Sequence, residues 1–276
     1  MSDSASAQTA QSGHSILQAP HGARLAYVQS ASKTSDQTKP GVVFIHGLMS
    51  DMTGSKALYL EDWCQQTGRD FLRFDQSGHG ASSGDFTEGG ISAWSEDSLA
   101  VIDALTDGPQ ILVGSSMGGW VMLHCALARP ERIVGLVGIA PAPDFTEDLM
   151  WQGFTQEQQK TVMEQGLLEL PSEYSDSPYR ISRHLIEDGR KNLLLREAIP
   201  LDLPVRIIQG LRDDAVPWQR ALTLQDKLTS EDVAVTLIKD GEHRLSRPGD
   251  LKALTDAIEA VTLALTPEAA ESPAVP

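Results

Sequence analysis

The sequence is poor in cysteine, in basic residues and in long apolar runs, and each shortage argues against a class of protein. Cys64 and Cys125 are the only cysteines in 276 residues, and each lies in a segment with a helical pattern. We therefore expect two free, buried thiols in a reducing compartment rather than a disulfide. No stretch approaches the roughly 18 consecutive apolar residues of a membrane helix, so we expect no membrane span.

The N-terminal pattern and the small number of basic residues also restrict the expected localisation and partners. The N-terminal segment has no basic start followed by an apolar core, and its first arginine is Arg24, which predicts a cytoplasmic protein. The 22 Lys and Arg residues are outnumbered by 38 Asp and Glu residues, for a formal net charge of −16. Such a charge repels nucleic acid and anionic membrane surfaces, so we expect neither as a partner.

Metal-binding spacings are missing as well. The sequence contains no C-x-x-C and no H-E-x-x-H, and its seven histidines are scattered along the chain. We therefore expect that the protein binds no metal and needs no cofactor.

What the sequence does contain is a regular alternation of short apolar runs with amphipathic segments. The runs are rich in β-branched residues, as buried parallel strands are, and the segments between them have helical lengths of about 10 to 15 residues. This alternation predicts a three-layer α/β fold with a mostly parallel sheet. The expected strands are 15–19, 23–29, 42–45, 70–75, 110–115, 132–140, 204–210 and 233–239.

The alternation is interrupted between residues 143 and 200. Three helical candidates, 145–154, 156–168 and 179–195, follow one another there with no strand between them. We interpret 143–200 as a helical cap inserted into a core domain. The core would consist of 14–142 and 201–265, with flexible tails at 1–13 and 266–276.

A glycine-flanked serine stands where an expected strand meets an expected helix. Gly114-Ser115-Ser116-Met117-Gly118 fits the pattern G-x-S-x-G only with Ser116 at its centre. In that pattern a nucleophilic serine occupies a strained strand-to-helix turn, and the glycines remove collisions two residues away on either side. Ser116 is therefore the candidate nucleophile. The alternative is a glycine-rich turn that only packs closely.

A nucleophilic serine needs a base, and the base needs an orienting carboxylate. His124 lies on the helix that the nucleophile begins, roughly 12 Å along its axis, which is too far for proton transfer. His184 lies in the insertion and is interpreted as a surface or lid residue. His243 follows the strand 233–239 and is the candidate base, and the acid is Asp213 or Asp214, which follow the strand 204–210.

Acyl transfer also requires backbone amides where negative charge develops on the substrate oxygen. One candidate is the amide of Met117, directly after the nucleophile and at a helix N-terminus. The second is the amide of Leu48, in the loop after the strand 42–45. His46 in that loop and His79 in the glycine-rich loop "FDQSGHGASSG" are interpreted as residues that shape their loops.

These motifs together resemble the α/β-hydrolase superfamily. They are His46-Gly47, "DQSGHGAS", the serine turn, "GLRDDAVP" and the late His243. More narrowly, "DGPQILVGSSMGGWVMLHCALARPERIVGLVGIA", "LPSEYS" and "GLRDDAVPW" are similar to the animal palmitoyl-protein thioesterases of the α/β-hydrolase-domain family, also described as acyl-glucuronide esterases. The resemblance runs from about residue 40 to 260 and includes the cap.

The resemblance implies a role for three residues. Ser116, Asp213 and His243 match the family's nucleophile, acid and base, and Asp213 is preferred over Asp214 by the family pattern G-x-x-D-x-x-V-P. The sequence departs from the family in two places. The animal proteins are mitochondrial, whereas this N-terminus lacks the pattern of a transit peptide, and His46 stands where another residue is expected before Gly47.

The predicted function is that of a serine hydrolase that cleaves carboxylic esters or thioesters through an acyl-enzyme. Its substrate would be a small-molecule ester or thioester or an S-acylated protein, and Trp151, Phe154 and Leu167 of the cap are candidates to wall an acyl pocket. The alternatives are a broad small-ester carboxylesterase, a carbon–carbon bond hydrolase, and a binding protein on the same fold without turnover.

Overall fold

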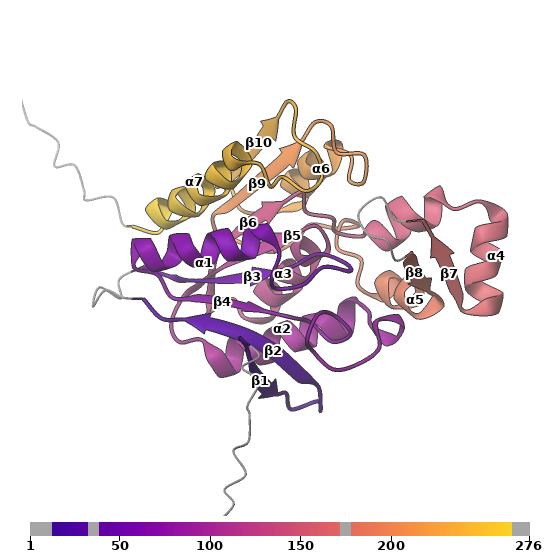
Figure 1. Cartoon of the computed structure of the whole chain (residues 1–276). Coiled ribbons are helices and arrows are strands. Elements are labelled where there is room, and N and C mark those ends of the chain that lie inside the picture. Colours follow the sequence, from indigo (N-terminus) through magenta and orange to yellow (C-terminus); the bar gives the residue numbers. More distant parts are fainter. Residues whose placement is uncertain (1–12, 33–38, 172–177, 267–276) are drawn as a thin grey trace, which may run out of the picture.

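The structure is a computed structural model that describes residues 13–32, 39–171 and 178–266. The tails predicted at 1–13 and 266–276 lie outside these ranges except for Gly13 and Thr266. An eight-stranded sheet of order β1-β2-β4-β3-β5-β6-β9-β10 runs through the described part of the chain (Figure 1). The strands are β1 (Ser15–Gln18), β2 (Arg24–Ser30), β3 (Gly41–Ile45), β4 (Phe71–Phe74), β5 (Gln110–Ser115), β6 (Ile133–Ile139), β9 (Val205–Gly210) and β10 (Val233–Ile238).

The sheet is mostly parallel. Only β2 runs against its neighbours, β1 and β4, while every other pair of adjacent strands is parallel. The central strands β3, β4 and β5 are buried along their whole length, as expected for strands covered on both faces. Because parallel strands end at the same edge, the loops after β3, β4, β5, β9 and β10 meet there.

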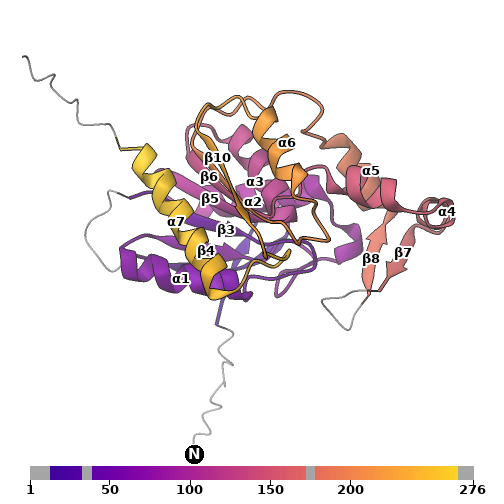
Figure 2. The ribbon, with the colours of Figure 1, turned by 90° about the horizontal axis from the view of Figure 1, so that it is seen from above.

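Helices cover both faces of the sheet and complete the three layers (Figures 1 and 2). Helices α1 and α7 pack with one apolar cluster, and α2, α3 and α6 pack with a second cluster on the opposite face. The bounds of these helices are α1 (Ser55–Thr67), α2 (Ile91–Leu105), α3 (Met117–Ala128), α6 (Gln219–Lys227) and α7 (Pro248–Ala264). The α/β class and the strands predicted from the sequence are confirmed.

The insertion contains a β-hairpin as well as helices, so the prediction that no strand interrupts 143–200 is wrong. Gly166 ends α4 in the left-handed region, at φ 83°. The next residues pair in antiparallel register, from Leu167 with Ser182 to Leu170 with Tyr179. The elements are η2 (Thr146–Trp151), a π-helical turn, α4 (Gln156–Gln165), β7 (Leu167–Leu170), β8 (Tyr179–Ser182) and α5 (Arg183–Lys191).

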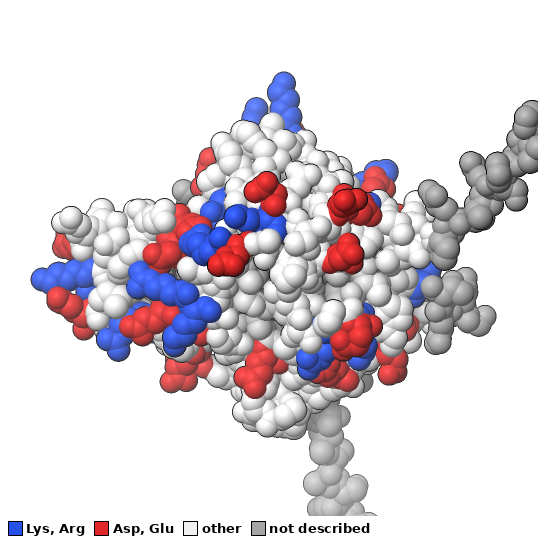
Figure 3. Space-filling model, turned by 180° about the vertical axis from the view of Figure 1, so that it is seen from behind, with Lys and Arg blue, Asp and Glu red and all other residues white. Residues whose placement is uncertain are grey.

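Two carboxylates, the buried Asp188 and the partly buried Asp148, attach the segment between β6 and β9 to the rest of the fold. Asp188 of α5 accepts hydrogen bonds from the Ser92 amide at 2.9 Å and the Ser92 hydroxyl at 2.6 Å, and so caps the first turn of α2. Asp148 of η2 pairs with Arg196 at 2.5 Å and with Arg220 of α6 at 2.9 Å. The basic and acidic side chains at the cap end of the molecule are accordingly interspersed on its surface (Figure 3).

Among the residues that the structure describes, no helix is long and apolar enough to cross a membrane.

Candidate active site

Ser116 occupies the sharp turn between β5 and α3. Its φ of 54° and ψ of −118° are strained for a residue with a side chain. The strain is supported by hydrogen bonds on both sides of the peptide. The Ser116 amide donates to the Ile139 carbonyl at 2.9 Å, and the Ser116 carbonyl accepts from the amides of Gly119 at 2.9 Å and Ala142 at 3.0 Å.

The structure brings Ser116, His243 and Asp213 together, although 127 residues separate the first two. His243 Nε2 lies 3.1 Å from Ser116 Oγ, and His243 Nδ1 lies 2.9 Å from Asp213 Oδ2. Ser116 and His243 are half-buried, whereas Asp213 is buried. With the ring proton on Nδ1, the serine hydroxyl donates to Nε2 and the imidazole donates to the carboxylate. Asp214 is exposed.

Asp213 is held by more groups than His243. Its Oδ1 accepts from the amides of Ala215 at 3.0 Å and Val216 at 2.7 Å. Its Oδ2 accepts, besides the imidazole, a hydrogen bond from Gln209 Nε2 at 2.9 Å. Sequence analysis missed Gln209. The signal was there, because a glutamine inside a buried apolar strand needs a polar partner.

A lysine of α1 holds the loop that carries His243. Lys56 Nζ donates to the carbonyl of Arg244 at 2.5 Å. Burial, helped by the nearby Arg244 charge, lowers the pKa of Lys56 to about 8. Lys56 was also missed, since nothing local to α1 indicates a contact with a loop 188 residues away.

The loop after β3 lies directly against Ser116. A side chain at Gly47 would place its Cβ 3.2 Å from Ser116 Cβ, so the Gly47–Leu48 peptide passes beside the Ser116 side chain. The amide of Met117, the first residue of α3, has no acceptor within its own helix. Both amides predicted from the sequence therefore belong to segments that border Ser116.

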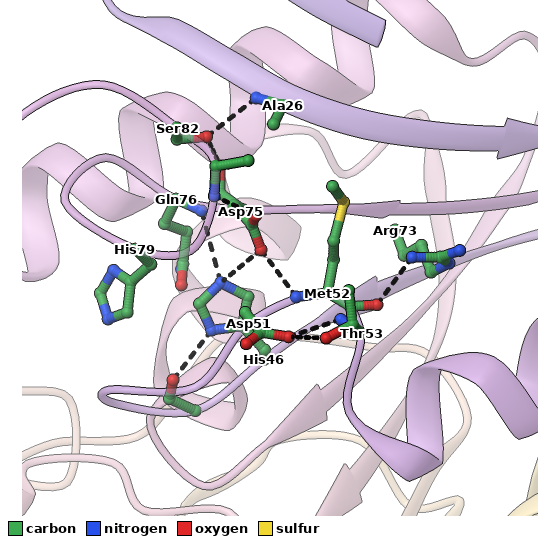
Figure 4. A network of polar contacts seen from close by, with 12 residues as sticks. Ala26, His46, Asp51, Met52, Thr53, Arg73, Asp75, Gln76, His79 and Ser82 are labelled. Atoms are coloured by element: carbon green, nitrogen blue, oxygen red, sulfur yellow. Dashed lines mark hydrogen bonds and ion pairs between the residues drawn. The ribbon is translucent and has the colours of Figure 1, made fainter. Parts of the chain in front are cut away.

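His46, the first residue of this loop, and His79, from the loop after β4, are buried, with 1% and 4% of their surface exposed (Figure 4). Burial lowers the pKa of His46 to about 4 and that of His79 to about 3, so both rings are neutral near pH 7. Asp75 lies between the two loops, where Oδ1 accepts from the Met52 amide at 2.6 Å and Oδ2 from the Ala81 amide at 2.8 Å.

The remaining candidate residues lie elsewhere. His124 Nε2 is 3.1 Å from the Asn192 carbonyl, where it packs α3 against the end of the cap, and His184 is exposed on α5. Trp151 packs edge-to-face with Phe154, at 6.4 Å between centroids, and Arg190 lies 4.5 Å from the Trp151 ring.

The two cysteines are buried and unpaired, as predicted from the sequence. Burial raises the pKa of the Cys125 thiol to about 12, which keeps it protonated and unreactive. Within 13–32, 39–171 and 178–266, no group of three or more His, Cys, Asp or Glu side chains is arranged to hold a metal ion.

Known proteins are similar to this chain over most of its length. The model of the family described as serine aminopeptidase, S33 matches residues 36–184. The mitochondrial palmitoyl-protein thioesterase ABHD10 of Mus musculus is 42% identical over 236 residues, which make up 85% of this chain and 77% of that protein.

Two solved structures are similar over nearly their whole length. The alpha/beta hydrolase domain-containing protein 10 from mouse matches with a TM-score of 0.83 and 39% identity, over 92% of this chain and 99% of that one. A crystal structure from Agrobacterium vitis S4 matches with a TM-score of 0.85 and 40% identity, over 90% of this chain and 98% of that one.

Proposed function

The chain belongs to the α/β-hydrolase family of serine hydrolases, and from this premise we propose that Ser116, His243 and Asp213 form its catalytic triad. The observation that carries the proposal is the single imidazole that is hydrogen-bonded to both other side chains, at 3.1 Å and 2.9 Å. The activity is cleavage of carboxylic esters and thioesters through an acyl-enzyme.

The first step is attack by Ser116 Oγ on the substrate carbonyl. His243 Nε2 takes the hydroxyl proton and then delivers it to the leaving alcohol or thiol, which departs as the Ser116 ester forms. Asp213 keeps the ring proton on Nδ1, so that Nε2 remains free to act as base. A water molecule then attacks the acyl-enzyme. His243 Nε2 takes a proton from this water and delivers it to Ser116 Oγ, and the carboxylic acid is released.

The oxyanion of each tetrahedral intermediate is bound by two backbone amides, those of Leu48 and Met117. The Leu48 amide follows Gly47, whose missing side chain leaves the peptide room beside Ser116. The Met117 amide stands at the N-terminus of α3, where the helix dipole favours an anion. Neither amide has to move when the charge develops.

The substrate that we propose is an S-acylated protein or a smaller fatty acyl thioester or ester. Support comes from the thioesterase relatives, which match this chain from the sheet through the cap. Trp151, Phe154 and Leu167, partly buried apolar residues of the cap, are proposed to contact the acyl chain. A small-ester carboxylesterase and a binding protein without turnover are the competing functions.

A reducing compartment, with the cytoplasm as the proposed location, suits two buried and unpaired thiols. The ABHD10 protein of Mus musculus is described as mitochondrial, so the mitochondrion is the alternative location. Fractionation of cells that express the full chain separates the two.

Labelling with a fluorophosphonate probe tests the triad. Wild-type protein should be labelled and Ser116→Ala should not, while Ser115→Ala, the matched control one residue away, should be labelled like wild type. Turnover of thioesters and oxyesters graded by chain length then separates the substrate classes. Absence of labelling in folded wild-type protein would rule out a working triad, and a rate that peaks at short oxyesters would favour the carboxylesterase.

A further inference from the structure

Two buried imidazoles flank the loop that follows β3. His46 begins the loop, and His79 reaches it from the loop after β4, with 5.0 Å between the ring centroids (Figure 4). Neither ring takes part in the proton transfers proposed above. Buried histidines need hydrogen-bond partners, and each of these two rings has one partner in a peptide group next to Leu48.

His46 fixes the peptide that precedes the Leu48 nitrogen. Its Nδ1 lies 2.8 Å from the carbonyl oxygen of Gly47, and since a carbonyl only accepts, the ring proton is on Nδ1. The Gly47 carbonyl and the Leu48 amide belong to one planar trans peptide, in which the C=O and N–H bonds point in opposite directions. Holding the carbonyl toward His46 therefore aims the Leu48 N–H away from it.

His79 fixes the following peptide with the opposite polarity. The Met49 amide lies 3.2 Å from His79 Nε2, and since an amide only donates, Nε2 carries no proton. The proton is on Nδ1, which lies 3.2 Å from the Ser77 carbonyl. Met49 itself has a φ of 53°, a left-handed conformation that is costly for a residue with a side chain and needs support from its surroundings.

We propose that His46 and His79 are positioning residues that clamp the two peptides of Leu48 and so preorganise its amide for the oxyanion. The proposal rests on the function proposed above, because it assumes that the Leu48 amide binds the oxyanion. His46 acts as donor to one peptide and His79 as acceptor from the next, so both rings must carry a proton on Nδ1, and His79 must in addition be neutral.

The surroundings of the clamp keep both rings in place. His46 Nε2, which carries no proton, accepts from the Gln76 amide at 3.4 Å. Asp75 Oδ1, from the residue before Gln76, accepts from the Met52 amide at 2.6 Å. Arg73 Nη1 donates to the Met52 carbonyl at 2.9 Å. The ring of His79 packs edge-on against Trp94, at 5.2 Å between centroids. The two histidine loops are thus tied to each other at several points besides the clamp itself.

Amide side chains test the clamp because they reproduce one ring nitrogen each. An asparagine amide occupies the place of imidazole Nδ1, and a glutamine amide the place of Nε2. His46→Asn therefore keeps the donor to Gly47, whereas His46→Gln does not. For His79 the order is reversed, since His79→Gln keeps an acceptor for the Met49 amide and His79→Asn does not. The control is His184→Gln, on the exposed face of α5.

The kinetic readout is kcat and KM for an acyl thioester, with the Ki of a trifluoromethyl ketone as a mimic of the oxyanion. Deleting an oxyanion donor lowers kcat about 10²- to 10³-fold. A donor that is present but poorly aimed should cost less, roughly 10- to 100-fold in kcat, with KM nearly unchanged and Ki raised in parallel. This loss is expected for His46→Gln and His79→Asn, while His46→Asn and His79→Gln stay within about threefold of wild type.

Hydrogen exchange of the segment 47–53 gives a readout that does not need activity. The amides of this segment should exchange faster in His46→Gln and His79→Asn than in His46→Asn and His79→Gln. The comparison is made between variants that unfold at the same temperature. Unchanged exchange and unchanged kcat in His46→Gln and His79→Asn would overturn the clamp, as would equal loss in all four variants. Faster exchange with unchanged kcat would instead refute the Leu48 amide as oxyanion donor. The His79 pair decides the question if His46→Gln does not fold.

Discussion

Replacing Asp213 by asparagine should disable the site while leaving the fold intact. The carboxylate receives four hydrogen bonds, two on each oxygen. Oδ1 accepts from the amides of Ala215 and Val216, and Oδ2 accepts from Gln209 Nε2 and His243 Nδ1. An asparagine side chain has one acceptor oxygen and one NH₂ group. Whichever way it turns, its NH₂ meets two donors.

The orientation that conflicts least decides the catalytic effect. Backbone amides cannot rearrange, so the asparagine oxygen stays with them and its NH₂ faces the imidazole of His243. The imidazole then accepts at Nδ1 and carries its proton on Nε2, where it can no longer take the proton of Ser116. The corresponding change in serine proteases lowers kcat about 10⁴-fold. We expect a loss of about 10³- to 10⁴-fold, and a stability cost of about 1–3 kcal/mol for the donors left without an acceptor.

The assay is kcat/KM for a thioester and an oxyester, with urea unfolding measured on the same preparations. Asp214→Asn is the matched control, because Asp214 is exposed and its loss should change the rate less than threefold. A larger loss in Asp214→Asn than in Asp213→Asn would refute the assignment of the acid. Near-wild-type activity in Asp213→Asn would refute the tautomer argument.

Three further changes test the site's supports. Gln209→Leu removes a hydrogen bond to the acid worth about 1.5 kcal/mol, so kcat should fall roughly tenfold, and unchanged kcat would show that the backbone amides suffice. Gly118→Ala places a Cβ 2.1 Å from a β3 carbonyl and should lower stability in urea by about 1–3 kcal/mol, whereas Gly153→Ala, with open space around it, should not. Burial lowers the pKa of His46 to about 4 and of His79 to about 3 from 6.5. Below pH 6.5 the unfolded chain therefore binds more protons than the folded one, and stability falls by about 1.6 kcal/mol per histidine between pH 6.5 and 5. His46→Asn and His79→Gln cannot titrate there, so each should reduce this pH dependence by that amount, and an unchanged slope would contradict the burial of a neutral ring.

The fold could be predicted largely from local patterns. Each core strand is a short apolar run. A strand that is buried on both faces, such as β5, has apolar residues in succession rather than in alternation, so its burial can be predicted from its composition. The hairpin of the cap was missed because β7 and β8 have four residues each and owe their hydrogen bonds to a partner segment. Gly166 was the available signal, since a glycine inside a helical pattern can end the helix.

The residues of the site also differ in how far the sequence predicts them. Ser116, Asp213 and His243 follow strands in segments with their own turn residues, so their positions could be predicted one by one. The contacts of Gln209 are different, because they depend on what the fold places opposite the side chain. The same holds for His46 and His79. Sequence analysis recognised that His46 and His79 shape loops, but the peptide groups that they bind became visible only in three dimensions.

The glycines of the serine turn show how these local motifs depend on one another. A Cβ at Gly114 would lie 2.4 Å from the Gly118 carbonyl oxygen, so Gly114 is required by the turn itself. A Cβ at Gly118 would lie 2.1 Å from the Ile45 carbonyl oxygen, so Gly118 is required by the end of β3. The second contact brings the start of α3 against the segment that continues into Gly47 and the oxyanion loop. The pattern G-x-S-x-G therefore fixes the position of Ser116, the proposed nucleophile, and through Gly118 it also sets how closely the proposed oxyanion amides approach it.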